Sequence, residues 1–153
     1  MKIYRYYGIE LDRSQIINYT NVAENELQHS LHVTFKFGLD TDDLEKVQPY
    51  LGQRCQICII GEGAYIKDVD GKSVIANIGW QVDSKSLNSL AELYKNPANP
   101  HVTLWINKEK DSEGKRIGKA VETKDCQFEP CEPFFIDGTF GVFDENNDAH
   151  QSL

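Results

Sequence analysis

Two short histidine motifs carry the clearest chemical signal in the sequence. The motif His-Val-Thr-Phe at 32–35 and the motif His-Val-Thr-Leu at 101–104 are near-copies that begin 69 residues apart. Each lies in an apolar segment rich in β-branched and aromatic residues, which is typical of a strand. Side chains alternate along a strand, so the His and the Thr of each motif share one face and the apolar residues share the other. Each copy therefore presents one imidazole beside one hydroxyl.

Two such pairs provide what the cleavage of a phosphodiester needs. If His32 and His101 stand on opposite sides of the phosphate, one removes a proton from the attacking oxygen and the other protonates the leaving oxygen. An unperturbed imidazole has a pKa of about 6.5, so both protonation states are accessible near neutrality. The hydroxyls of Thr34 and Thr103 can donate hydrogen bonds to the non-bridging phosphate oxygens. This chemistry requires neither a metal nor a cofactor.

Two further residues are candidates for binding a substrate. Lys36 and Trp105 each follow a motif threonine by two positions, so strand alternation predicts that they share its face. Trp105 would then stack a nucleobase, and Lys36 would meet a phosphate. The alternative is that Trp105 fills a gap at the rim and Lys36 is a solvated charge.

The other histidines and the cysteines are weaker candidates. His29 lies three residues before His32 without further ligands at chelating spacing, and His150 lies near the chain end, so we treat both as bystanders. The CxxC pair at 55–58 falls in a predicted strand, where its two side chains point to opposite faces and would need a backbone knuckle to hold zinc. The pair at 126–131 is flanked by prolines. We expect reduced thiols and no metal site.

Composition predicts one globular domain over residues 1–153. The chain is 40% hydrophobic and 26% charged, which is enough apolar material for one core. Neither a leader peptide nor a membrane segment is recognisable, so we expect a cytoplasmic protein with no membrane partner.

Charge favours a small substrate over a long nucleic acid. The net charge is −8, and the last 29 residues hold seven acids and no base. Segment 108–124 is the one basic stretch; it is a solvated segment or a flank of the cleft. A protein that grips a long RNA backbone normally carries a broad basic surface.

The surrounding elements predict an α+β fold with antiparallel sheet. Strands are expected at 3–11, 31–38, 54–83 with a turn at 70–71, 101–107 and 134–145. Helices are expected at 41–51 and 86–96, and are plausible within 111–124, whereas 12–28 is ambiguous and the tail is expected to fray. The duplicated strand and helix unit would place the two motifs in equivalent positions of two half-domains.

These motifs resemble those of the 2H phosphoesterase superfamily, which is named for two His-x-Ser/Thr motifs. HVTFKFG is similar to the first motif of that family, and NPHVTLWIN is similar to its second. The resemblance implies a bilobal fold of two pseudo-symmetric antiparallel sheets with outer helices around a central cleft. It also implies that His32, Thr34, His101 and Thr103 line this cleft without a metal.

The leading hypothesis is therefore an enzyme, a phosphodiesterase acting on a small nucleotide, a 2′,3′-cyclic phosphate or a cyclic oligonucleotide signal. Small members of the superfamily carried by phages and mobile elements destroy such signals or repair RNA, so a 2′,3′-cyclic phosphodiesterase acting on RNA ends is the first alternative. A second is a nucleotide- or RNA-end-binding module without turnover. A third is a partner-binding protein that uses its acidic C-terminal segment.

Overall fold

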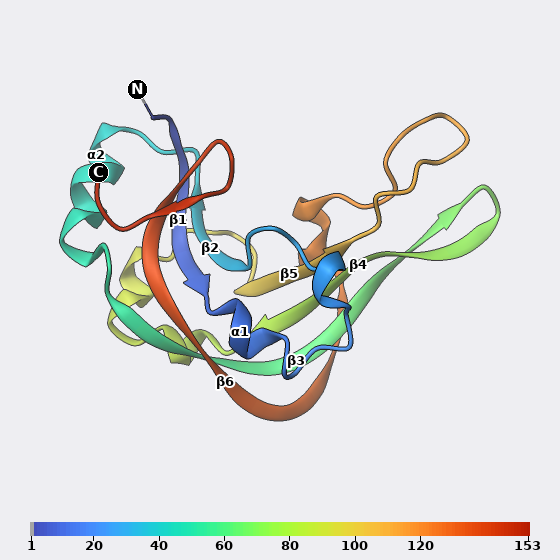
Figure 1. Cartoon of the computed structure of the whole chain (residues 1–153), viewed down its shortest axis with the longest axis horizontal. Helices are drawn as coiled ribbons and strands as arrows, with labels where there is room; N and C mark the ends of the chain where they lie inside the picture. Colours follow the sequence, from blue (N-terminus) through green and yellow to red (C-terminus); the bar gives the residue numbers. More distant parts are fainter. Residues whose placement is uncertain (1) are drawn as a thin grey trace.

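A computed structural model describes residues 2–153, which form a strongly curved antiparallel sheet with a few short helices around it (Figure 1). The strands are β1 (Tyr4–Leu11), β2 (His32–Phe37), β3 (Arg54–Val69), β4 (Lys72–Val82), β5 (His101–Ile106), β6 (Gln127–Asp144) and β7 (Ala149–His150). The helices are α1 (Arg13–Ile16), η1 (Glu24–Glu26), α2 (Thr41–Val47), η2 (Gln48–Tyr50), η3 (Ser84–Leu93) and η4 (Ala120–Asp125). The predicted α+β class with antiparallel sheet is confirmed.

The strands belong to one continuous sheet, whereas two separate sheets were expected. Its order is β2-β1-β6-β3-β4-β5, with β7 added beside β6. The halves are joined because β3 has 16 residues and β6 has 18, so both strands run through both halves. Residues 54–59 of β3 pair with 134–139 of β6, of which 138–139 also pair with β1, whereas residues 61–64 pair with 127–130. A register shift between Ile59 and Gly61 separates the two parts.

The two edges of this sheet, β2 and β5, lie next to each other, so that the sheet is nearly a barrel. Loops from the opposite half bridge the gap. The backbone N–H of Lys95 donates to the carbonyl of Phe35 at 2.9 Å, and that of Gln28 donates to the carbonyl of Leu104 at 2.9 Å. The curvature thus brings together two motifs that are far apart in the sequence.

The apolar face of each motif strand is buried, as alternation predicted. Val33 and Phe35 of β2 and Val102 and Leu104 of β5 have no exposed surface. They belong to one core that lies inside the curved sheet and also contains Trp80. The opposite faces of β2 and β5 are consequently fixed in orientation by the hydrophobic packing beneath them.

The helical predictions are correct in position but only partly in type. Instead of an α-helix over 86–96, the chain forms the 3₁₀ helix η3, and Asn88 interrupts it with φ 51°. The leucines at 87, 90 and 93 are buried, and this spacing of three suits a 3₁₀ helix, which has three residues per turn. Helix α2 ends at Val47, and a 3₁₀ turn containing Pro49 follows it.

Two other segments differ from expectation. Within 111–124 only the end is helical, as part of η4, and the preceding loop is closed by a bridge between Lys110 and Arg116. The C-terminal tail was expected to fray, but residues 149–150 within it form β7, which pairs with β6. None of the helices between residues 2 and 153 is long and apolar enough to cross a membrane.

Candidate active site

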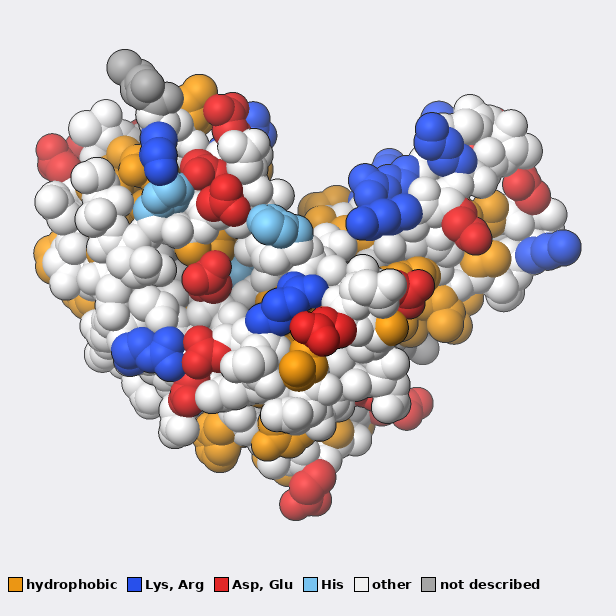
Figure 2. Space-filling model, viewed as in Figure 1, with side chains coloured by type: hydrophobic (Ala, Val, Ile, Leu, Met, Phe, Trp, Pro, Cys, Tyr) orange, Lys and Arg blue, Asp and Glu red, His pale blue; other side chains and the backbone are white. Residues whose placement is uncertain are grey.

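The four motif side chains line one cleft. Its volume is about 620 Å³, and it lies between β2 and the loop before β5 on one side and η4 on the other. Figure 2 shows a notch in the outline of the molecule, with a histidine side chain at one edge and lysine and arginine side chains gathered across from it. The lining includes His32, Thr34, His101 and Thr103, together with the less expected Tyr6, Phe37, Lys95 and Lys124. The two motifs thus line the same cleft, as predicted.

The first imidazole is held among aromatic rings. The centroid of the His32 ring lies 5.0 Å from that of Tyr6 and 5.1 Å from that of Phe143. Its Nδ1 lies 2.9 Å from the hydroxyl oxygen of Ser30. Burial lowers the pKa of His32 to about 4, since it disfavours the charged imidazolium; the backbone of Ser30 opposes this shift, and the nearby His101 adds to it. The two imidazoles are therefore close enough to interact electrostatically.

The second imidazole is fixed by a backbone carbonyl. His101 Nδ1 lies 2.8 Å from the carbonyl oxygen of Asn99. Burial lowers the pKa of His101, the Asn99 backbone opposes that shift, and the positive charge of Lys124 adds to it. Both histidines are therefore biased toward the neutral form.

The two threonine hydroxyls differ in their surroundings. Thr103 Oγ1 lies 2.7 Å from Thr123 Oγ1, which belongs to η4 and is fully buried. For Thr34, no hydrogen bond of the hydroxyl is found within residues 2–153, although its backbone carbonyl accepts one from the Asn96 side chain at 3.1 Å. Sequence reasoning missed Thr123, because only the folded chain brings η4 against β5.

A bulge in β2 places Lys36 and Phe37 differently from the prediction. Thr34 pairs with Gly8, but Lys36 pairs with the next residue, Tyr7, so β2 contains one extra residue. A bulge of this kind reverses the alternation of side chains along the strand. Lys36 consequently lies over Tyr7, and Phe37 takes the place on the cleft side. The strand register thus departs from the expected alternation at Lys36, although Lys36 and Thr34 both line the cleft.

The charge of Lys36 is directed away from the cleft. Its stem still lines the cleft, but its Nζ donates to both carboxylate oxygens of Asp43 at 2.8 Å. This contact lowers the pKa of Asp43, whose carboxylate also accepts a hydrogen bond from the backbone N–H of Asp40 at the start of α2. Phe37 is 66% exposed and stacks on Tyr6 with the ring centroids 5.9 Å apart. Phe37 is therefore the exposed aromatic ring of the cleft, and the buried Tyr6 supports it.

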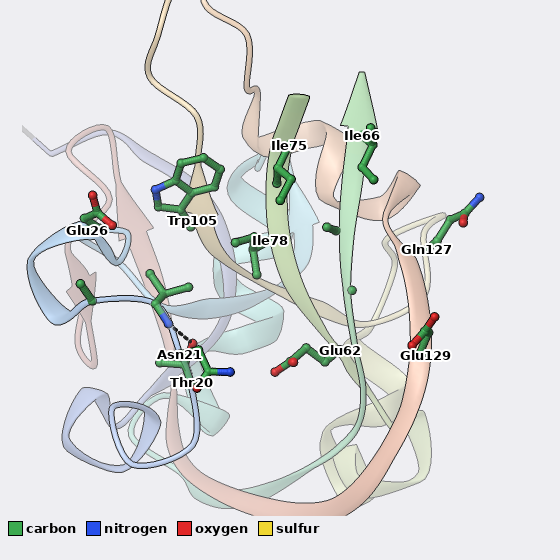
Figure 3. Close-up of a pocket in the computed structure, with 14 residues that line it drawn as sticks. Thr20, Asn21, Glu26, Glu62, Ile66, Ile75, Ile78, Trp105, Gln127 and Glu129 are labelled. Carbon is green, nitrogen blue, oxygen red and sulfur yellow. Dashed lines mark hydrogen bonds between the residues drawn. The ribbon is translucent and has the colours of Figure 1, made fainter. Parts of the chain in front are cut away.

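The second motif contains a bulge at the same position. Thr103 pairs with Gly79, whereas Trp105 pairs with Ile78, so β5 also has one extra residue directly after its motif threonine. Trp105 therefore turns to the face opposite Thr103, and the expectation of a shared face is wrong. It lines a separate cavity of about 760 Å³ with Ile78 and Glu62 (Figure 3). The equal position of the bulges is a local likeness between the two motif strands.

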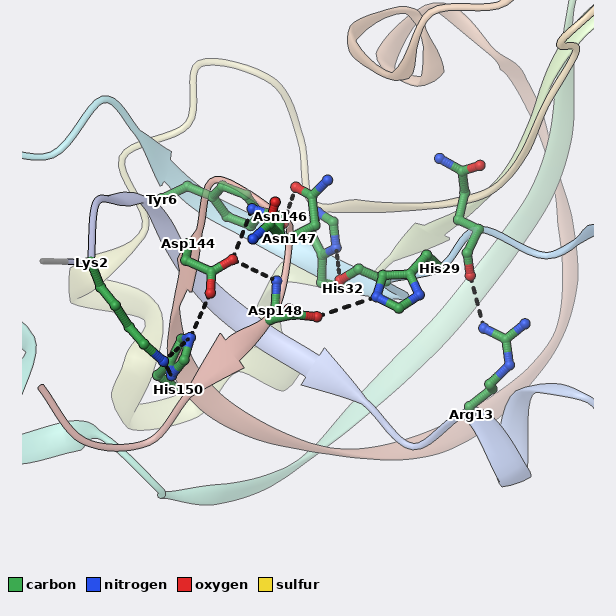
Figure 4. A network of polar contacts seen from close by, with 12 residues as sticks. Lys2, Tyr6, Arg13, His29, His32, Asp144, Asn146, Asn147, Asp148 and His150 are labelled. Atoms are coloured by element: carbon green, nitrogen blue, oxygen red, sulfur yellow. Dashed lines mark hydrogen bonds and ion pairs between the residues drawn. The ribbon is translucent and has the colours of Figure 1, made fainter.

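The remaining histidines belong to a polar network at the rim (Figure 4). His29 Nε2 lies 3.2 Å from Asp148 Oδ1, and His150 Nε2 lies 2.7 Å from Asp144 Oδ2. His29 also lines the cleft, which the sequence did not indicate. The acidic C-terminal segment is in this way held against the first motif.

The four cysteines form neither a disulfide nor a metal site within residues 2–153. All four thiols are free, and burial raises the pKa of Cys55 and Cys126 to about 11. Among residues 2–153 there is no group of three or more His, Cys, Asp or Glu side chains that could hold a metal ion.

No protein-family model matches the chain, and no curated protein matches its sequence. The function of the protein therefore has to be inferred from the geometry of the cleft.

Proposed function

We propose that this protein is a metal-independent phosphodiesterase that acts on small nucleotide or cyclic oligonucleotide phosphodiesters. The observation that carries this proposal is the convergence of His32, Thr34, His101 and Thr103 on one cleft. A site that only binds nucleotides does not require two proton-transfer groups. A pair of interacting imidazoles, each beside a hydroxyl, matches the requirements of general acid and general base catalysis.

The aromatic surroundings of His32 support an assignment of the roles. Burial among aromatic rings lowers the pKa of His32 to about 4, which makes His32 the neutral imidazole and hence the general base. His101 is then the protonated partner and the general acid. As the P–O bond to the attacking oxygen forms, His32 takes the proton of that oxygen. As the P–O bond to the leaving oxygen breaks, His101 delivers a proton to it. The bound phosphate anion raises the pKa of both histidines and so favours the protonated form of His101.

Hydrogen bonds determine which nitrogen takes part. His101 Nδ1 donates to the Asn99 carbonyl, so the proton that it transfers comes from Nε2. His32 Nδ1 faces the Ser30 hydroxyl, which can accept a hydrogen bond and leaves the Nε2 lone pair free as the base. Thr34 and Thr103 donate to the non-bridging oxygens while negative charge develops there.

The cleft suits a ligand of nucleotide size. Its volume of about 620 Å³ lies in the range of about 300–1,000 Å³ that is usual for small-molecule sites. Phe37, which is exposed and supported from beneath by Tyr6, offers a stacking surface for a base, and Lys95 and Lys124 supply positive charge at the rim. Since the chain is acidic overall, these few contacts favour a small substrate over a long RNA.

The fold is compatible with the bilobal architecture of the 2H phosphoesterases that the motifs resemble. If β3 and β6 are divided at the register shift, each half contains one motif strand at its edge. The matching bulges support a duplicated unit. Under this proposal the two halves correspond to the two lobes of that family.

A substrate panel tests the proposal. The wild-type protein is incubated in excess EDTA with 2′,3′-cyclic mononucleotides, with 2′–5′ and 3′–5′ linked cyclic dinucleotides and trinucleotides, and with a tRNA fragment that ends in a cyclic phosphate. We expect turnover of at least one small compound and a loss of several orders of magnitude in His32→Ala and His101→Ala, both folded by circular dichroism. Activity that needs a divalent ion, or a histidine variant that keeps more than about a tenth of it, contradicts the mechanism.

The same panel separates the alternatives. Far more efficient turnover of the tRNA fragment, with a steep dependence on salt, indicates RNA end repair. Binding of a nucleotide without turnover, weakened in the variant that lacks both histidines, indicates a binding module.

A further inference from the structure

We infer that Thr123, anchored by Asn77, is a positioning residue that presets Thr103 as a hydrogen-bond donor to the phosphate of the substrate. This inference rests on the proposed function and adds to it a device outside the two motifs. It makes the two motif threonines unequal, since Thr34 has no comparable partner within the described residues.

The observation is a chain of three buried or partly buried polar side chains. Asn77 Nδ2 donates to Thr123 Oγ1 at 3.1 Å, and Thr123 Oγ1 lies 2.7 Å from Thr103 Oγ1. Asn77 and Thr123 are fully buried, whereas Thr103 lines the cleft. This series of hydrogen bonds therefore connects the interior of the second half with the cleft in which the phosphate would bind.

Asn77 fixes this series of hydrogen bonds by donating both hydrogens of its amide nitrogen. The second hydrogen bond of Nδ2 goes to the backbone carbonyl of Lys119, at 2.7 Å, directly before η4. Asn77 Oδ1 is buried without a hydrogen-bond partner. A buried carbonyl oxygen without a partner is unfavourable, so the useful part of this side chain is its donor end.

The numbers of donors and acceptors determine which way the hydrogen bonds of this series point. In the structure the Thr103 hydroxyl donates to Thr123. Thr123 already accepts from Asn77, and among residues 2–153 its own hydroxyl hydrogen is donated to no acceptor while Thr103 is the donor of the pair. When a phosphate oxygen enters, both hydroxyls can rotate so that Thr123 donates to Thr103 and Thr103 donates to the phosphate. Each hydroxyl in the chain then both donates and accepts, which strengthens the bonds cooperatively.

The fold keeps η4 close enough for this contact. Gly79, which pairs with Thr103, lies directly under Thr123, and a Cβ at that position would lie 2.5 Å from Thr123 Cγ2 and 2.8 Å from the carbonyl oxygen of Val102. Only glycine permits this approach without movement of the backbone. The hydroxyl pair is thus supported by the strand on one side and by the Asn77 amide on the other.

The test compares Thr123→Val, which keeps the shape and removes the hydroxyl, with Thr123→Ser, which keeps the hydroxyl. Activity is measured on the small substrate found with the panel above. We expect Thr123→Val to lower kcat about tenfold with KM changed less than twofold, a smaller loss than the roughly 100-fold expected for Thr103→Ala. Thr123→Ser should retain most of the activity. Thr139→Val, on β6 beside Arg54 and outside the cleft lining, is the matched control and should leave kcat unchanged.

A double-mutant cycle excludes a merely structural effect. If Thr123 acts through Thr103, Thr123→Val causes no further loss of kcat in the Thr103→Ala background. An unchanged kcat in Thr123→Val, or an equal loss in both backgrounds, overturns the inference while the proposed function stands on the histidine variants. A wild-type protein that turns over nothing on the panel overturns both.

Discussion

His101 Nδ1 lies 2.8 Å from the carbonyl oxygen of Asn99, a group that can only accept hydrogen bonds. This nitrogen therefore keeps its hydrogen whether the imidazole is neutral or charged, and only Nε2 titrates. The first motif lacks such a constraint, because the partner of His32 is the Ser30 hydroxyl, which can donate or accept. The two imidazoles are thus prepared differently, although their motifs are nearly identical.

The dependence of rate on pH should be bell-shaped, with its optimum on the acid side of neutrality. The active form has His32 neutral and His101 protonated, so kcat/KM rises as pH increases past the His32 pKa of about 4. It falls as pH increases through the His101 pKa, which burial holds below 6.5. Measurement of kcat/KM between pH 4 and 8 checks this.

Lys124 provides a control for that assignment. Its positive charge contributes to the lowered pKa of His101, so Lys124→Met should move the alkaline limb of the profile to higher pH and leave the acid limb in place. A profile that is flat from pH 4 to 8, or an acid limb that moves instead, would argue against the roles given to the two histidines.

Phe37→Ala should raise KM about tenfold with little effect on kcat. Phe37 is exposed at the cleft and stacks on Tyr6, and loss of one base-stacking ring typically costs about 1–3 kcal/mol. Trp105→Ala is the matched control, since Trp105 lines the other cavity and should leave KM unchanged. The reverse result would place the base near Trp105.

Lys36→Met should lower thermal stability more than activity. The Lys36 ammonium is bound by both oxygens of Asp43, so its removal leaves a buried carboxylate without its cation. We expect a lower Tm and a kcat/KM within about twofold of wild type. The double variant Lys36→Met, Asp43→Asn should recover part of the Tm. A large rise in KM without a change in Tm would instead show that Lys36 binds the phosphate.

The sequence was sufficient to predict the motif strands, the hairpin turn and the buried face of each motif, because these follow from local alternation and turn residues. Asp70 and Gly71, for example, do form the turn between β3 and β4. The sequence was not sufficient to predict which face the residues after each motif threonine occupy. A bulge depends on the register of the neighbouring strand, so the faces of Lys36 and Trp105 could not be read from their spacing alone.

Two other features depend on contacts between distant segments. The sheet is continuous because β3 and β6 run from one half into the other. No local sequence pattern indicates that these two strands continue across both halves. Thr123 touches Thr103 only because Gly79 lets η4 approach the sheet. The titrating groups of the site were thus visible in the sequence, whereas the residues that hold them were not.

The stability of the protein should decrease between about pH 6.5 and pH 4 because of His32. In the unfolded chain its pKa returns to about 6.5, whereas in the folded protein burial holds it at about 4. Below pH 6.5 the unfolded state therefore binds a proton that the folded state does not, and the free energy of unfolding falls as pH falls. For a shift of this size the loss reaches at most about 3 kcal/mol near pH 4.

Urea denaturation of wild type and His32→Phe at several values between pH 4.5 and 7.5 measures this contribution. Phenylalanine occupies the space between Tyr6 and Phe143 without titrating, so the variant should lose less stability than wild type as pH decreases. His29→Asn, at the exposed rim, is the control and should follow the wild-type curve. Equal slopes for wild type and His32→Phe would mean that folded His32 binds its proton as readily as the unfolded chain does. The assignment of His32 as the neutral histidine would then be wrong, and the general base would have to be sought in His101.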